Sequence, residues 1–144
     1  MPIERQHIAN NEIEIEIPIH LLANNPSIAI DSTGVKATVG DFKVSEEMVK
    51  HLKKAYLAAY ADAPSATDAV VDVELYNVTD GNAVTKVTYS GDSGYKESAD
   101  IASTLKTLVG KILTGRINVT TASATSGATQ VFRSIVLRLV LGVA

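Results

Sequence analysis

The most apolar stretch of the chain lies close to its carboxyl end, at residues 130–141. Taken as a strand, it is largely apolar on both faces: the majority of the odd positions from Val131 and the majority of the even positions from Phe132 carry apolar side chains. A strand of this kind lies inside a sheet or between two surfaces. A second run, residues 111–121, precedes it across a turn of small residues at 122–128. We expect these two runs to form the centre of the fold.

Residues 12–19 alternate without exception between isoleucine on one face and glutamate or proline on the other. This period of two predicts a strand with one dry face and one wet face. Pro18 cannot donate a ladder hydrogen bond, so we expect the strand to lie at a sheet edge or to end its pairing there. An edge strand can also pair with a neighbouring subunit, although the row of glutamates would restrict such pairing. Residues 1–11 are expected to form an extended arm.

The clearest hairpin signal lies between residues 69 and 90. Alternate residues from Val71 to Leu75 are apolar, and residues 83–90 return with the same period. The Asp-Gly pair between the two runs supplies the positive φ that a tight turn requires. Shorter strands are predicted at residues 28–30 and at residues 35–44, the second either as one strand or as a hairpin broken at residues 40–41.

A helix is predicted over residues 45–61. Ser45 is a hydroxyl N-cap, and two glutamates follow it at the positive end of the helix dipole. Apolar residues recur at helical spacing from Met48 to Ala59, and the high alanine content favours a helix. From Lys53 onward the same residues also fit a period of two, so a strand in the second half is the alternative.

Together these elements predict a mainly β chain with one or two helices. The second helix, or an irregular crossing with the same burial, is expected at residues 98–109 before Gly110. Short strands separated by turns need a second layer to cover each dry face, and an antiparallel two-layer β-sandwich is the economical arrangement. A chain of 144 residues fits a single domain, 1–144, with one core.

Two parts of the chain carry a resemblance to a known architecture. They are residues 73–81, Val-Glu-Leu-Tyr-Asn-Val-Thr-Asp-Gly, and the turn at 125–128 with the long apolar strand after it. With these features, residues 69–143 resemble the second half of a jelly-roll sandwich of the kind found in carbohydrate-binding modules and viral capsid domains. The resemblance implies a role in assembly or in sugar binding. The predicted helix at 45–61 departs from it.

Composition and charge narrow the classes of function. The formal net charge is -3 and the pI is about 5.5, which gives no basic surface for nucleic acid. The chain has no cysteine, which excludes disulfides, thiolate metal sites and a cysteine nucleophile. Residues 1–7 do not resemble a signal peptide, and the longest apolar run, 135–144, is too short for a membrane span. We expect no nucleic-acid partner, no membrane insertion and a cytoplasmic or particle-associated protein.

One short motif suggests chemistry. Residues 91–94, Gly-Asp-Ser-Gly, spell most of the serine-protease nucleophile motif, and the last three also spell the aspartic-protease triplet. The three histidines stand in no matching context, and Tyr95 follows where a small residue is needed, so a polar turn is the preferred interpretation. The turn carboxylates lack the spacing of a calcium loop. We expect no metal, no cofactor and no catalytic residue.

Two other sets of residues are candidate binding surfaces. A pyranose ring stacks on aromatic side chains, and the exposed candidates for such a site are Tyr76 and Tyr95, with Asp92 as a polar group. Apolar surface beyond what a thin sandwich needs marks an interface between subunits. The interface candidates are Ile13, Ile15, Ile17, Val136, Arg138 and Val140.

These observations favour a non-catalytic structural protein. We expect it to self-assemble as a homo-oligomer or as the building block of a larger particle, such as a virion or a filament. The alternative is a ligand-binding module, for example for carbohydrate. A small hydrolase is the third hypothesis.

Overall fold

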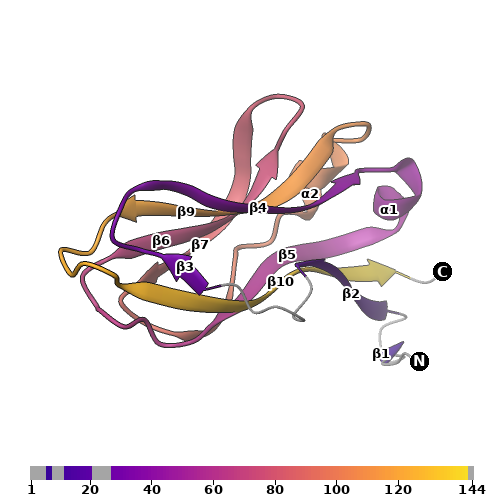
Figure 1. Cartoon of the computed structure of the whole chain (residues 1–144). Helices are drawn as coiled ribbons and strands as arrows, with labels where there is room; N and C mark the ends of the chain where they lie inside the picture. Colours follow the sequence, from indigo (N-terminus) through magenta and orange to yellow (C-terminus); the bar gives the residue numbers. More distant parts are fainter. Residues whose placement is uncertain (1–5, 8–11, 21–26, 143–144) are drawn as a thin grey trace.

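Two antiparallel sheets face each other in the computed structural model, which describes residues 6–7, 12–20 and 27–142 (Figure 1). The first sheet has the order β1-β2-β10-β5-β8, with β3 also beside β10, and the second has the order β4-β9-β6-β7. The strands of the first sheet are β1 (Gln6–His7), β2 (Glu12–His20), β3 (Ser27–Ala29), β5 (Leu52–Ala61), β8 (Gly94–Glu97) and β10 (Thr129–Gly142). The strands of the second sheet are β4 (Gly34–Lys43), β6 (Val70–Asn77), β7 (Asn82–Ser90) and β9 (Ile112–Thr121).

The longer strands pass back and forth between the two sheets. After β2 in the first sheet come β4 in the second, β5 in the first, the β6–β7 pair in the second, and then β8, β9 and β10 in alternation. Every described pairing is antiparallel. The predicted mainly β, two-layer antiparallel sandwich is therefore confirmed, and its winding is jelly-roll-like.

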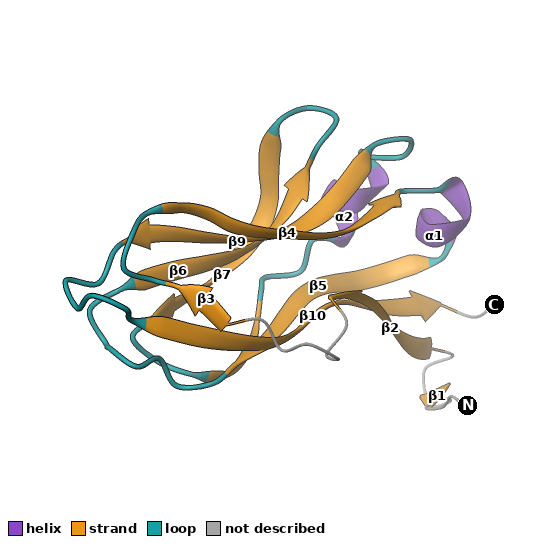
Figure 2. Cartoon of the chain, in the orientation of Figure 1, coloured by secondary structure: helices purple, strands orange, loops and turns teal. Residues whose placement is uncertain are grey.

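The two described helices are short and lie at the margins of the sandwich (Figure 2). They are α1 (Glu46–Lys50) and α2 (Ala102–Lys106). The side chain of Ser45 accepts a hydrogen bond from the backbone N–H of Met48 at 3.1 Å, so the predicted N-cap is confirmed. No helix of the described residues is long and apolar enough to cross a lipid bilayer.

The prediction of a helix over residues 45–61 is wrong beyond Lys50. After α1 the chain enters β5, which lies between β10 and β8. Its side chains at Ala55, Leu57 and Ala59 fill the core. Pairing with strands on both sides outweighs the helix preference of alanine, because each residue gains ladder hydrogen bonds and burial that an isolated helix would not provide. The period-two alternative is the correct one.

The apolar carboxyl-terminal strand lies where it was predicted, inside a sheet. Strand β10 pairs with β2 on one side and with β5 on the other. Its odd residues Ile135, Leu137 and Leu139 are at most 1% exposed and belong to the core. After the register shift between Phe132 and Ser134, the even residues Val136, Arg138 and Val140 point to the opposite side, away from the second sheet, and we call that side the outer face of the first sheet.

The predicted hairpin is also confirmed. Strands β6 and β7 pair in register, with Val73 opposite Val87, and Gly81 takes a φ of +78° in the turn. Val71, Val73 and Leu75 are buried. Of the two predictions for residues 35–44 the single strand is correct, because β4 runs through Gly40 with a local shift of register.

The two sheets approach each other closely at the carboxyl end of β2. A side chain on Gly115 would place its Cβ 2.9 Å from Cγ2 of Ile19, and one on Gly40 would meet the backbone of the same residue. Ile19 is 7% exposed, so this end of β2 is held against the second sheet. The predicted edge position of β2 is also seen: on the edge away from β10, and among the described residues, only Glu12 and Ile13 pair with another strand, the two residues of β1.

Candidate functional site

The outer face of the first sheet gathers three of the predicted interface residues. Val136, Arg138 and Val140 follow one another along β10, and each lies in register with one residue of β2 and one of β5. The rows across the three strands are Pro18–Val136–Ala58, Glu16–Arg138–Tyr56 and Glu14–Val140–Lys54. Ala58 and Val140 are 0% and 6% exposed without belonging to the core, because side chains on this face cover them.

Arg138 is the centre of the polar contacts on the outer face. Its Nε donates to Oε2 of Glu97 at 2.7 Å, and its Nη1 lies 3.4 Å from Oε2 of Glu14. The guanidinium also lies 4.6 Å from the ring centroid of Tyr56, within range of a cation–π contact. Residues from β2, β5 and β8 thus meet at one arginine of β10.

The electrostatics of this cluster follow from its hydrogen bonds. The Arg138 hydrogen bond lowers the pKa of Glu97, and the same contact raises the pKa of the guanidinium. Burial raises the pKa of Tyr95, whose hydroxyl also donates to Oε2 of Glu97 at 3.0 Å. The cluster therefore holds a charged arginine and a charged glutamate at neutral pH, with a neutral tyrosine beside them.

Two tyrosines lie side by side on the same face, where β5 meets β8. Tyr60 is in register with Tyr95, and their exposed fractions are 43% and 56%. The prediction that Tyr95 is an exposed aromatic residue is correct. Its neighbour Tyr60 was not predicted, because residues 45–61 were assigned to a helix.

The other predicted interface residues lie on the opposite side of the sheet. Ile13, Ile15 and Ile17 are in register with Leu141, Leu139 and Leu137, which all point inward. We call these three isoleucines the isoleucine row. Ile15 is 38% exposed although its register partner Leu139 is only 1% exposed, so the second sheet does not fully cover this part of β2. The six predicted interface residues therefore form two surfaces and not one.

The predicted sugar site is not assembled. Tyr76 lies on β6 in the second sheet, while Tyr95 lies on β8 in the first. The guanidinium of Arg116 covers Tyr76, with 3.6 Å between Cζ and the ring centroid. Because that ring face is already stacked on an arginine, Tyr76 is not available as a platform for a pyranose.

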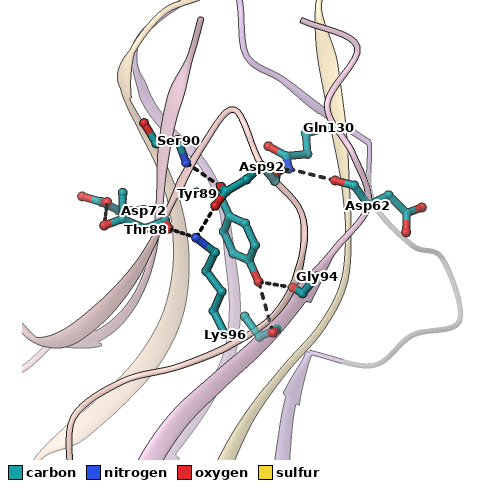
Figure 3. Close-up of polar contacts among 10 residues, drawn as sticks. Asp62, Asp72, Thr88, Tyr89, Ser90, Asp92, Gly94, Lys96 and Gln130 are labelled. Carbon is teal, nitrogen blue, oxygen red and sulfur yellow. Dashed lines mark hydrogen bonds and ion pairs between the residues drawn. The ribbon is translucent and has the colours of Figure 1, made fainter. Parts of the chain in front are cut away.

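Asp92 belongs to the turn between β7 and β8 (Figure 3). It accepts hydrogen bonds from the backbone N–H of Ser90 at 2.8 Å and from Nζ of Lys96 at 2.6 Å. Lys96 also donates to the Thr88 carbonyl and lies over the ring of Tyr89. The Lys96 hydrogen bond lowers the pKa of Asp92, which is opposite to what a general base near neutral pH requires.

Hydrogen bonds hold the turn that contains Asp92 in place. The amide of Gln130 donates to the carbonyls of Asp62 and Asp92 at 2.9 and 3.0 Å and so ties the turn to β10 (Figure 3). A serine-protease-like role for this turn would require a nearby histidine, but His51 lies at the far end of β5. His51 precedes this strand, whereas Asp62, which shares the Gln130 amide with Asp92, follows it. Ten residues at roughly 3.3 Å each, about 30 Å, separate the two ends.

No group of three or more metal-ligating side chains that could hold an ion occurs among the described residues. No protein-family model matches the chain, and no curated protein is significantly similar to it. The candidate sites therefore depend on the geometry of these residues alone.

Proposed function

We propose that this protein is a non-catalytic structural subunit that self-assembles, as a homo-oligomer or as the building block of a larger particle such as a virion or a filament. The observation that carries the proposal is the exposure of Ile15, 38%, in a row whose register partners are core leucines. A partner that covered the isoleucine row would extend the core of the sandwich.

The energy available from such a contact is appreciable. Full burial of an isoleucine side chain contributes about 1.5–3 kcal/mol, so the exposed fraction of Ile15 alone is worth about 1 kcal/mol. Backbone hydrogen bonds of β2 would add to this energy, because from Glu14 onward no described strand pairs with the edge of β2 that faces away from β10. An open strand edge beside an apolar row is a surface on which another chain can add a strand.

Two surfaces on opposite sides of one sheet also suit extended assembly. A single two-fold contact closes at a dimer, whereas a subunit with a second contact surface can add further copies. The isoleucine row and the outer face of the first sheet provide two such surfaces. The winding of the two sheets resembles the jelly roll of viral capsid domains, and this resemblance supports the proposal.

Light scattering coupled to size-exclusion chromatography tests the proposal. We expect the protein at micromolar concentration to elute with a mass that is a multiple of its 15.2 kDa chain. Ile15→Ser should reduce that mass, while Val78→Ser, which changes a valine that is 49% exposed in the β6–β7 turn, should leave it unchanged. A strict monomer at all concentrations tested would disprove the proposal.

One observation favours a second function, the binding of a carbohydrate or a similar ligand. Tyr60 and Tyr95 are exposed, adjacent and next to the polar groups of Glu97 and Arg138, a combination that suits a sugar ring and its hydroxyls. A glycan array should then show binding that Tyr95→Ala removes and Tyr76→Ala leaves unchanged. An array without binding would reject this second function.

A further inference from the structure

Opposite charges lie on the two sides of β10 on the outer face of the first sheet. Strand β2 carries three glutamates there, and β5 carries Lys53 and Lys54. Lys54 shares a row with Val140 and Glu14, and the Lys53 side chain approaches the backbone of Gly142, whose register partner on β2 is Glu12. We call the glutamates Glu12, Glu14 and Glu16 the acidic row, and Lys53 with Lys54 the lysine pair.

The acidic row and the lysine pair lie on opposite sides of β10. Adjacent strands are about 4.8 Å apart, so the backbones of β2 and β5 lie about 10 Å from each other. Lys53 and Lys54 form no hydrogen bond or ion pair with any described residue, and Lys54 acts on Asp100 only at longer range. The face therefore has an acidic side and a basic side with Val136 and Val140 between them.

We propose that the outer face of the first sheet packs against the same face of a second copy of this chain, around a two-fold axis that runs along β10. Rotation about such an axis keeps each residue at the same height along the strand and exchanges the two sides of β10. The acidic row of one copy then lies over the lysine pair of the other, and the reverse contact forms as well. Facing sheets packed in this aligned manner are about 10 Å apart.

The residues on the axis are compatible with this packing. Val136 of the two copies would meet near the axis, where apolar side chains are favoured in an interface, while Val140 is already covered within its own chain. Arg138 would also lie near the axis, and its charge is already compensated by Glu97 and Glu14. Tyr56 stacks on Arg138 and adds an aromatic side chain to the same area.

The pair Tyr60–Tyr95 lies outside this contact. Ser134 is the β10 residue in register with Tyr60, whereas the pairing of β2 with β10 ends at His20 opposite Ile135. The acidic row and the lysine pair lie at the other end of these strands. The proposed contact therefore covers Arg138 and leaves the rings of Tyr60 and Tyr95 beyond its edge.

This inference rests on the proposed function, and it names the partner, a second copy of the chain, and the surface through which the two copies bind. The experiment uses two full-length variants with reversed charges. In Glu12→Lys/Glu16→Lys the acidic row becomes basic while the contact between Glu14 and Arg138 is kept, and in Lys53→Glu/Lys54→Glu the lysine pair becomes acidic. The matched control for the second variant is Lys36→Glu/Lys43→Glu, which makes the same change of charge on β4 in the other sheet.

Sedimentation velocity of each variant alone and of an equimolar mixture measures the association. We expect each charge-reversed variant alone to associate at least about tenfold more weakly than the wild type, since most of the attractive contacts between the acidic row and the lysine pair become repulsive. The mixture should recover association, because each variant then faces the opposite charge, and the control should behave as the wild type does. Thermal denaturation of each variant verifies that it is folded.

The possible results separate the two proposals. A wild type that assembles while both reversed variants assemble equally well would overturn the inference and leave the proposed function standing. A mixture that associates no better than its components would also overturn it. A monomeric wild type would reject both.

Discussion

The outer faces of the two sheets differ in how completely their charges are paired. On the second sheet the side chains of Asp72 and Glu74 are only 5% and 8% exposed, although they point away from the core. Lys86 and Thr88 donate to Asp72, and Arg116 donates to Glu74. On the first sheet, the acids that contact Arg138 are 28% and 40% exposed.

The difference arises from which strands carry the charges. On the second sheet each acid of β6 has its cationic partner on an adjacent strand: Lys86 of β7 lies one row along from Asp72, and Arg116 of β9 is in register with Glu74. The pairs close within the chain and shield one another from water. On the first sheet β10 separates the acidic row from the lysine pair, and Lys53 and Lys54 form no ion pair with any described residue. In the proposed dimer the second copy supplies the opposite charge for these lysines. One face is complete in a single chain, and the other is suited to a partner.

The largest effect on stability should come from breaking a charge pair on the outer face of the second sheet. We expect Glu74→Ala to destabilise the protein by about 3 kcal/mol, because it leaves Arg116, whose side chain is only 22% exposed, without its carboxylate. Urea denaturation measures this free energy. If the two residues form a closed pair, Glu74→Ala/Arg116→Met should be more stable than Glu74→Ala alone. Equal stability of the two variants would show that the arginine finds solvent or another partner.

A smaller effect is expected at the equivalent arginine of the open face. Arg138 is 21% exposed, close to the value for Arg116, but its acids remain accessible to water. Arg138→Ala should therefore cost about 1 kcal/mol in urea denaturation, since Glu97 and Glu14 can be solvated once the arginine is gone. A loss as large as that for Glu74→Ala would contradict the contrast between the two faces.

The strands of this sandwich differ in how far the sequence predicts them. The β6–β7 hairpin and β10 are predicted well, because their own alternation and turn residues specify them. Strand β5 was taken for a helix because its alanines favour that state locally, and only pairing with β10 and β8 decides otherwise. That error also concealed Tyr56 and Tyr60, which share the outer face only if the segment is a strand.

The candidate site depended on contacts that no local pattern reports. Arg116 covers Tyr76 because β9 pairs with β6, a register set by residues forty positions apart. In the same way, the apolar pattern of β10 indicates two dry faces but does not tell which face meets the second sheet. The isoleucine row and Val136, Arg138 and Val140 were therefore grouped together, although they lie on opposite sides. The alternation of apolar and polar residues tells which residues share a face of a strand. Only the arrangement of the strands in the two sheets tells which of the faces meets the core.

The ionisation of Glu97 depends on its contact with Arg138. Its pKa in the folded protein is lowered, chiefly by the hydrogen bond from Arg138, below the value of about 4.3 that an unfolded glutamate has. A lowered pKa stabilises the fold above the unfolded value, and this contribution is lost as the pH falls through the folded pKa. In an NMR titration the Glu97 carboxyl should titrate below its usual range, and Arg138→Ala should return it there. An unchanged pKa in the variant would exclude Arg138 as the cause.

The smallest effect on stability is expected at the residues proposed to face a second copy. Lys54→Ala removes a side chain that forms no hydrogen bond or ion pair with any described residue, so the unfolding free energy of the monomer should change by less than about 0.5 kcal/mol. Its effect should appear in association instead, as a weaker dimer with a smaller dependence on salt, because screening acts on charges that meet across the contact. Urea denaturation at low protein concentration and sedimentation at several salt concentrations measure the two effects separately. A variant that loses stability as a monomer but keeps its association would place Lys54 among the contacts that hold one chain together, as Arg116 is on the other sheet.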